Sequence, residues 1–162
     1  MRVVLQRVSG ASVSVEGETI AQIGTGLVVL AGIFPGDGAP QIDWLADRIV
    51  GLRIFPDTAA VQDSAAAGSS AAGGTGKTMN RSVMDVQGSL LVVSQFTLAA
   101  DLSRGRRPGF STAAPPEVAE PLFAAFVDAL ITRWPDVQTG RFGADMQVSL
   151  VNDGPVTFLL ER

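Results

Sequence analysis

Two short apolar runs, residues 27–34 and 90–93, constrain the fold more than any other feature of the sequence. Neither run alternates with polar residues, and the first is flanked by glycine- and proline-containing segments that are typical of turns. A strand that is exposed on one face alternates between apolar and polar residues, whereas a strand that is buried on both faces does not. We therefore predict that both runs are buried strands, with residues 27–34 at the centre of a sheet.

The other elements are expected to surround these strands. Residues 3–15 and 19–23 alternate and are separated by a turn signal, which predicts a hairpin. Apolar residues at helical spacing predict one helix over residues 40–51 and a second between Pro115 and Trp134. The expected core stripe of the second helix is Leu122, Phe123, Phe126, Val127, Leu130 and Ile131. Further strands are expected at 53–55, 137–142, 146–151 and 156–160, with a turn at 152–155.

This order gives seven or eight strands and two helices, without an internal repeat or the regular strand-helix alternation of a doubly wound fold. We predict a mixed α/β (α+β) fold in which a curved, mixed or antiparallel sheet approaches a partial barrel. Residues 1–162 are expected to form a single domain. Because two helices leave apolar edges and faces of such a sheet uncovered, we also expect a symmetric dimer.

Residues 58–76 differ in composition from the rest of the chain. They are small, nearly uncharged and without periodicity, which predicts a mobile surface insertion. Residues 76–78 read Gly-Lys-Thr, like the end of a P-loop, but the first glycine of that motif would have to stand where the chain has Ala71. Because no apolar strand precedes this position either, we do not interpret it as a phosphate-binding loop.

The composition restricts the chemistry that the chain can perform. It contains no His, no Cys and no Tyr, which excludes a Ser-His-Asp triad, a cysteine nucleophile, disulfides and every metal site built on His or Cys. We expect neither a metal nor another cofactor. Carboxylates, one lysine, arginines, hydroxyls, backbone amides and groups of the substrate itself remain.

The charge and hydropathy patterns limit the partners. The formal net charge of −4 provides no global basic field, so a nucleic-acid partner would need a local basic patch. The densest positive charge is at residues 101–108, where Arg104, Arg106 and Arg107 form either a solvated loop or a contact for a phosphate. No apolar run approaches the roughly 18–20 residues of a membrane helix, and the N-terminal run is too short for a signal peptide. With no cysteine to indicate an oxidising compartment, we expect a cytoplasmic protein without a membrane partner.

Four short motifs resemble one known family: Ser-Gln-Phe-Thr-Leu at 94–98, Arg-Pro-Gly-Phe-Ser at 107–111, Gly-Arg-Phe-Gly-Ala-Asp-Met at 140–146 and Asn-Asp-Gly-Pro-Val-Thr at 152–157. With residues 6–13 and 51–55, they resemble the D-aminoacyl-tRNA deacylases, formerly called D-tyrosyl-tRNA deacylases, in order and over nearly the whole chain. The chain departs from the family where residues 58–76 intervene and Thr78 separates Lys77 from Met79.

The resemblance implies hydrolysis of the ester that joins a D-amino acid to the 3′-terminal adenosine of tRNA, in a homodimer with active sites at the subunit interface. Gly154 and Pro155 resemble the Gly-cis-Pro motif that one subunit inserts into the active site of the other, where its backbone carbonyls exclude L side chains. Arg7 resembles the residue that ties this motif down by hydrogen bonds. Without the resemblance, Arg7 would be read as part of a surface salt bridge and Pro155 as an ordinary trans turn proline.

The resemblance also assigns the pocket. Its catalytic residues are expected to be Ser94, Gln95, Phe96 and Thr97, and its further substrate-binding residues Phe142, Met146 and Ala113. Phe142 and Met146 are expected to hold the terminal adenine, although their pattern alone also fits two core side chains on one strand face.

The sequence offers Thr97 no base: His and Cys are absent, and Lys77 lies across the segment 58–76. We therefore expect substrate-assisted catalysis, in which the ribose 2′-hydroxyl helps to activate water or the ester and backbone N–H groups stabilise the oxyanion. Since achiral glycine has no side chain to exclude, glycyl-tRNA is an expected second substrate. Two alternatives stay open: a related editing deacylase for L-alanyl- or glycyl-tRNA, and a non-enzymatic dimer that binds an RNA end or a small metabolite.

Overall fold

The computed structural model describes residues 1–57, 78–103 and 105–162. Arg104 and the predicted insertion at 58–76 therefore lie outside the described residues. The elements in chain order are β1 (Arg2–Val15), β2 (Glu18–Ile23), β3 (Gly26–Gly32), α1 (Ala39–Gly51), β4 (Phe55–Pro56), β5 (Met79–Arg81), β6 (Ser89–Ser94), the 3₁₀ helix η2 (Phe96–Ala99), α2 (Pro116–Arg133), β7 (Val137–Thr139) and β8 (Gln147–Glu161).

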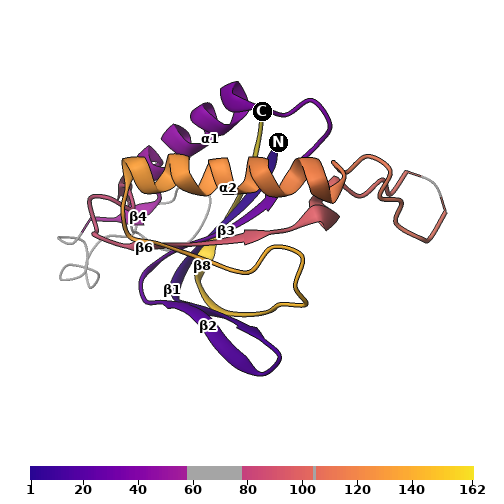
Figure 1. Ribbon diagram of the computed structural model, residues 1–162. Helices are drawn as coiled ribbons and strands as arrows, with labels where there is room; N and C mark the ends of the chain where they lie inside the picture. Colours follow the sequence, from indigo (N-terminus) through magenta and orange to yellow (C-terminus); the bar gives the residue numbers. More distant parts are fainter. Residues whose placement is uncertain (58–77, 104) are drawn as a thin grey trace.

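A six-stranded mixed sheet forms the body of the structure (Figure 1). Its path is β2-β1-β3-β6-β7, and β8 pairs along almost the whole of β1. The pairs β3–β6 and β6–β7 are parallel, whereas β1 is antiparallel to β2, β3 and β8. The expected mixed sheet with β3 at its centre is confirmed.

The two apolar runs are buried on both faces, as predicted. Leu27 and Val29 of β3 contribute to the core beneath the helices, while Val28 points into a second core on the other face. In β6, Leu90 and Leu91 divide in the same way. A strand that supplies two cores has no solvated face, which explains why its sequence does not alternate.

The sheet curls around the second core and brings β2 next to β7. The backbone N–H of Gln22 in β2 donates to the side-chain oxygen of Gln138 in β7 over 2.8 Å. The curl encloses a set of small and branched side chains: Val8, Ala11, Val13, Ala21, Ile23, Val28, Leu91 and Val93. The result is the nearly closed, barrel-like sheet that the sequence predicts.

Helices α1 and α2 lie together on the other face of the sheet (Figure 1). A proline opens α2, Glu117 lies in its first turn and Arg133 in its last, an arrangement that complements the helix dipole. Its buried stripe is Phe123, Phe126, Val127 and Leu130. Within the described ranges, neither helix is long and apolar enough to cross a membrane.

The structure differs from the prediction at the bounds of two strands and at one expected core residue. The strand expected at 53–55 is reduced to Phe55–Pro56 because its partner β5 has only three residues. The strand expected at 137–142 ends at Thr139, after which the chain turns through Arg141–Ala144. Ile131 is exposed, since it follows Leu130 by one residue and so lies off the buried stripe of α2.

The predicted turn at 152–155 is wrong: β8 continues through it. Gln6 of β1 pairs with Thr157, and Val8 pairs with Asn152. Residues 153–156 therefore stand opposite the single residue Arg7 and form a bulge in an otherwise continuous strand. Residues 152–155 have the composition of a turn. Strand β1 nevertheless pairs with β8 both before and after them, so the chain continues as a strand and does not reverse direction.

Candidate functional site

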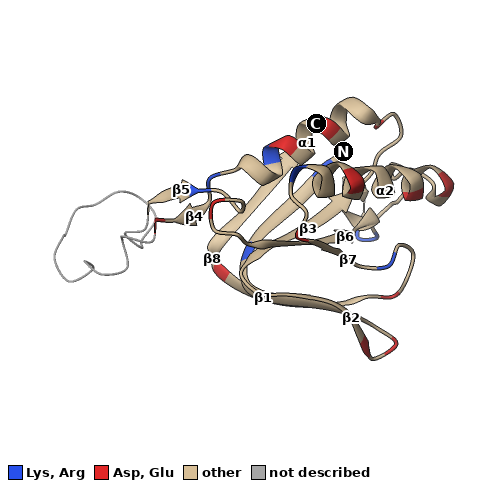
Figure 2. Cartoon of the chain, turned by 60° about the vertical axis from the view of Figure 1, so that its left-hand side comes forward, with Lys and Arg blue, Asp and Glu red and all other residues tan. Residues whose placement is uncertain are grey.

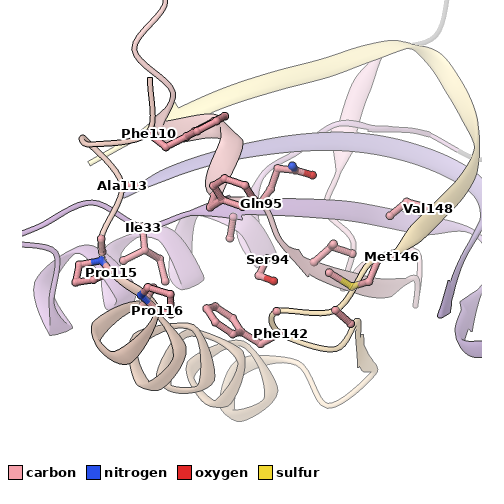
Figure 3. A pocket seen from close by; sticks show the side chains of 17 residues that line it. Ile33, Ser94, Gln95, Phe110, Ala113, Pro115, Pro116, Phe142, Met146 and Val148 are labelled. Atoms are coloured by element: carbon pink, nitrogen blue, oxygen red, sulfur yellow. The ribbon is translucent and has the colours of Figure 1, made fainter. Parts of the chain in front are cut away.

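A cavity of about 700 Å³ opens where β3 and β6 end beneath the first turn of α2 (Figure 3). Four segments of the chain surround it: residues 31–33, residues 93–96, residues 110–119 and residues 142–148. Its lining residues are Ala31, Ile33, Val93, Ser94, Gln95, Phe96, Phe110, Ala113, Ala114, Pro115, Pro116, Ala119, Phe142, Gly143, Ala144, Met146 and Val148. The structure thus brings together six of the predicted site residues: Ser94, Gln95, Phe96, Ala113, Phe142 and Met146.

The cavity wall carries no ionisable side chain among the described residues. Its polar groups are the Ser94 hydroxyl, the Gln95 amide and the main chain. Within the described ranges, no group of acidic side chains is arranged to hold a metal ion either. General acid–base chemistry by a side chain in this wall is therefore not available.

The segment that follows β6 is fixed by its backbone. The N–H of Gln95 donates to the carbonyl oxygen of Ala31 over 2.8 Å. The guanidinium of Arg2 donates to the carbonyl oxygen of Leu98 over 2.6 Å, and the Thr112 hydroxyl donates to that of Ala99. Helix η2 is thus held to the sheet on one side and to the loop before α2 on the other.

A glycine in β3 permits this close approach. A Cβ atom at Gly32 would lie 2.8 Å from the Cβ of Leu98 and 3.1 Å from the carbonyl oxygen of Gln95. Neither neighbour is the far end of a flexible side chain, so any side chain at this position would displace η2. Neither Gly32 nor Arg2 carries a signal for such a role in the sequence alone.

Thr97 is not part of the cavity wall, contrary to the expectation that it lines the pocket. Its position in the 3₁₀ helix leaves it exposed. Its hydroxyl accepts a hydrogen bond of 2.5 Å from the side-chain amide of Gln95, which does line the cavity. Because an amide is not a base, this contact orients the hydroxyl without activating it as a nucleophile.

Phe142 and Met146 combine the two interpretations that the sequence left open. Both line the cavity, and both are half-buried against a core. The ring of Phe142 lies 5.9 Å from that of Phe123 in α2. The two side chains therefore form a wall of the cavity that is supported from behind.

Two exposed aromatic rings stand at the mouth of the cavity. The rings of Phe96 and Phe110 pack edge to face with their centres 5.1 Å apart, and Phe96 is 60% exposed. Phe110 belongs to the motif at 107–111, but nothing in that motif indicates that Phe110 lines the cavity. Such exposed aromatic faces are typical of sites that bind unpaired bases or apolar groups.

The bulge of β8 lies apart from the cavity: neither Gly154 nor Pro155 lines it. The peptide bond between them is cis, as the resemblance implies. Arg7 is only 5% exposed and donates through Nε to the carbonyl oxygen of Asp153 over 2.9 Å. The same nitrogen lies 3.0 Å from the Asp153 carboxylate, and Nη1 donates to the carbonyl oxygen of Ile54. Arg7 therefore fixes the bulge at its first residue, and its ion pair with Asp153 is buried on the side of the arginine.

The comparisons with known proteins agree with these observations. The family described as D-Tyr-tRNA(Tyr) deacylase matches residues 4–161. A curated D-aminoacyl-tRNA deacylase of Prosthecochloris aestuarii is 54% identical over 162 residues, which cover 99% of each chain. A solved structure described as c-Myc DNA Unwinding Element Binding Protein is 39% identical, with a TM-score of 0.86 over 100% of this chain and 99% of that one.

A second solved structure, described as a probable eukaryotic D-amino acid tRNA deacylase, shares the fold with a TM-score of 0.75 at 16% identity, over 98% of this chain and 97% of its own. The family match spans every element described above, from β1 to β8. The chain belongs to the D-Tyr-tRNA(Tyr) deacylase family.

Proposed function

We propose that this protein hydrolyses the ester bond of D-aminoacyl-tRNA and releases the free D-amino acid and tRNA. One observation carries the proposal: the Ser94–Phe96 segment of this family borders a cavity that has no ionisable group among its described lining residues. Such a cavity suits a substrate that brings its own reactive hydroxyl.

In this reaction, water adds to the ester carbonyl and the bond from that carbon to the ribose 3′-oxygen breaks. The 3′-oxygen leaves as the hydroxyl of the terminal adenosine. We assign activation of the water or the ester to the neighbouring 2′-hydroxyl of the same ribose, because the cavity wall supplies no base.

The backbone N–H of Phe96, which lines the cavity, is the proposed oxyanion donor. Phe96 is the first residue of η2, so its N–H has no acceptor within that helix, and no described residue accepts a hydrogen bond from it. Thr97 then acts by position, through its hydrogen bond with Gln95.

The terminal adenine is proposed to lie against Phe142 and Met146. An aromatic ring and a polarisable thioether are suitable partners for the face of an unpaired base. Ala113 borders the same cavity from the segment that precedes α2.

We propose that the active site is completed in a homodimer. Gly154 and Pro155 do not line the cavity of their own chain, so a second copy would have to insert them next to the substrate. The long strand β8, which pairs only with β1 among the described strands, exposes Val151, Phe158 and Leu159. An apolar, unpaired edge of this kind is suited to a subunit interface. The proposed location is the cytoplasm, where aminoacyl-tRNA is made and used.

The test is release of amino acid from matched D-Tyr-tRNA, L-Tyr-tRNA and Gly-tRNA, with and without a chelator. We expect rapid, chelator-insensitive hydrolysis of the D-ester, hydrolysis of the glycyl ester, and no hydrolysis of the L-ester. If the protein binds the aminoacylated end but hydrolyses none of the three, the proposed activity is wrong and the chain is a binding protein.

A further inference from the structure

The loop between η2 and α2 carries a basic surface that the proposed chemistry does not use. Arg106 and Arg107 are exposed, and neither forms an ion pair with a described residue. In a chain with a net charge of −4, two adjacent unpaired arginines form a local positive patch.

This loop is anchored beside the mouth of the cavity. The backbones of Asp101 and Gly109 exchange two hydrogen bonds, of 2.7 and 2.9 Å, and so close the base of the loop. Directly after this base, Phe110 lines the cavity and packs against Phe96. Figure 1 shows the loop extending beyond the N-terminal end of α2, and neither arginine lines the cavity.

Two other stretches of surface next to the cavity do not favour a polyanion. The first turns of α2 expose Glu117 and Glu120, and Figure 2 shows acidic residues along this helix. Residues 141–147 include Arg141, but Asp145 lines the same small hollow of about 300 Å³, together with Glu16. Of these three stretches, only residues 105–110 combine arginines with no carboxylate.

The one carboxylate at the base of the loop is already engaged. Asp101 accepts a hydrogen bond of 2.9 Å from the backbone N–H of Ser103, and its pKa is lowered by the hydrogen bonds from Ser103. It is not paired with Arg106 or Arg107. Both guanidinium groups are therefore available to an external anion.

We propose that Arg106 and Arg107 bind phosphate groups of the tRNA acceptor end and direct the RNA out of the cavity past Phe110. This inference rests on the proposed function, because it assumes that the terminal nucleotide of the tRNA occupies the cavity. The contacts are independent of sequence and act on affinity and orientation, not on the chemical step.

The test compares the double variant Arg106→Ala/Arg107→Ala with a control that removes the same charge, Arg48→Ala/Arg53→Ala. The control residues are exposed near the end of α1, which does not line the cavity and lies at the other end of the molecule (Figure 1). Each protein is assayed on full D-Tyr-tRNA and on D-tyrosyl-adenosine, an ester that has no phosphate.

Loss of two contacts to single-stranded phosphates should reduce the slope of log(kcat/KM) against log(salt) by roughly 1.4. Between about 50 and 200 mM salt, kcat/KM of the wild type on tRNA should then fall roughly sevenfold more than that of the double variant. The control should keep the wild-type slope, and no protein should change on D-tyrosyl-adenosine by more than about twofold.

Binding of uncharged tRNA, measured over the same salt range, separates this inference from the proposed function. If the wild type hydrolyses no ester, the proposed function fails, yet a smaller salt slope of the double variant in binding would still support the phosphate contact. An unchanged slope in binding overturns the inference, as does a slope that falls equally in the control. An equal loss of rate on tRNA and on D-tyrosyl-adenosine also overturns it, because the loop would then support the cavity and not the RNA.

Discussion

Replacing Arg7 by alanine should lower the free energy of unfolding more than the loss of an exposed ion pair would. The substitution removes the donors to the carbonyl oxygens of Asp153 and Ile54. Ile54 is 3% exposed, so its carbonyl oxygen would be left buried without this donor, at a cost of about 1–3 kcal/mol. Loss of the charge-assisted hydrogen bond to Asp153 costs about 1–2 kcal/mol more, because the Arg7 side chain is buried and water does not screen its charge.

The combined loss is about 3 kcal/mol, which corresponds to a decrease in Tm of roughly 6–12 °C for a chain of this size. Asp153→Ala is the matched control. It removes the partner carboxylate, which is 45% exposed, and keeps the backbone carbonyl that Arg7 holds, so it should cost less than about 1 kcal/mol. Arg7→Lys, with a single point donor in place of a fork, should fall between the two.

The assay is thermal unfolding of the three variants and the wild type at one protein concentration, since the proposed dimer would make Tm depend on concentration. Deacylation is then measured well below the lowest Tm. We expect folded Arg7→Ala to lose selectivity for D-Tyr-tRNA over L-Tyr-tRNA, because the residue that precedes Gly154 is no longer held. Equal Tm values for Arg7→Ala and Asp153→Ala would refute the reasoning, since the buried carbonyl contacts would then contribute nothing.

Two further substitutions test other parts of the site, and a third tests the turn at Ser82–Asp85 that precedes β6. Gly32→Ala places a Cβ 2.8 Å from that of Leu98, so it should displace η2. We expect kcat/KM on D-Tyr-tRNA to fall about tenfold or more in a protein that circular dichroism shows to be folded. A wild-type rate would contradict this. Thr97→Ala should reduce the rate only a few-fold if the substrate supplies the reactive hydroxyl, and complete loss of turnover with the fold intact would exclude the substrate-assisted route. The pKa of Asp85 is lowered from 3.8 mainly by the backbone N–H and hydroxyl of Ser82, so its contribution to stability is present above 3.8 and is lost as pH falls through the lower native pKa. The wild type should therefore be more stable than Asp85→Asn at neutral pH, and the difference should shrink in acid unfolding below 3.8.

The parts of the fold that the sequence predicts well are those in which burial alone decides the pattern. Strands β3 and β6 supply side chains to two cores, so both are continuously apolar, and this pattern predicts a strand that is buried on both faces. The boundaries that fail depend on a partner elsewhere in the chain. Strand β4 is short because β5 is short, and the bulge of β8 replaces a turn because β1 is long enough to pair on both sides of it. Neither partner length can be read from the local sequence.

The site divides in the same way. The motif at 94–98 predicts that Ser94 and Gln95 border a pocket, and they do. The same motif does not predict that Thr97 is exposed and outside the cavity wall, because this depends on the 3₁₀ turn that begins at Phe96. Arg2 and Gly32 were missed for a related reason: each acts on the backbone of a segment more than sixty residues away, and nothing near them in the sequence indicates it.

The position of the bulge makes a further demand on the proposed mechanism. The cavity holds the groups that would bind the ester and the adenine, whereas Gly154 and Pro155 lie outside it and are held by Arg7 on another strand. A protomer alone would therefore have the site for hydrolysis without the element proposed to select the D-configuration. The proposed mechanism thus assigns hydrolysis and chiral selection to different parts of the structure. A variant that loosens the bulge can lose selectivity through a change on β1 or β8, while the cavity keeps every one of its lining residues.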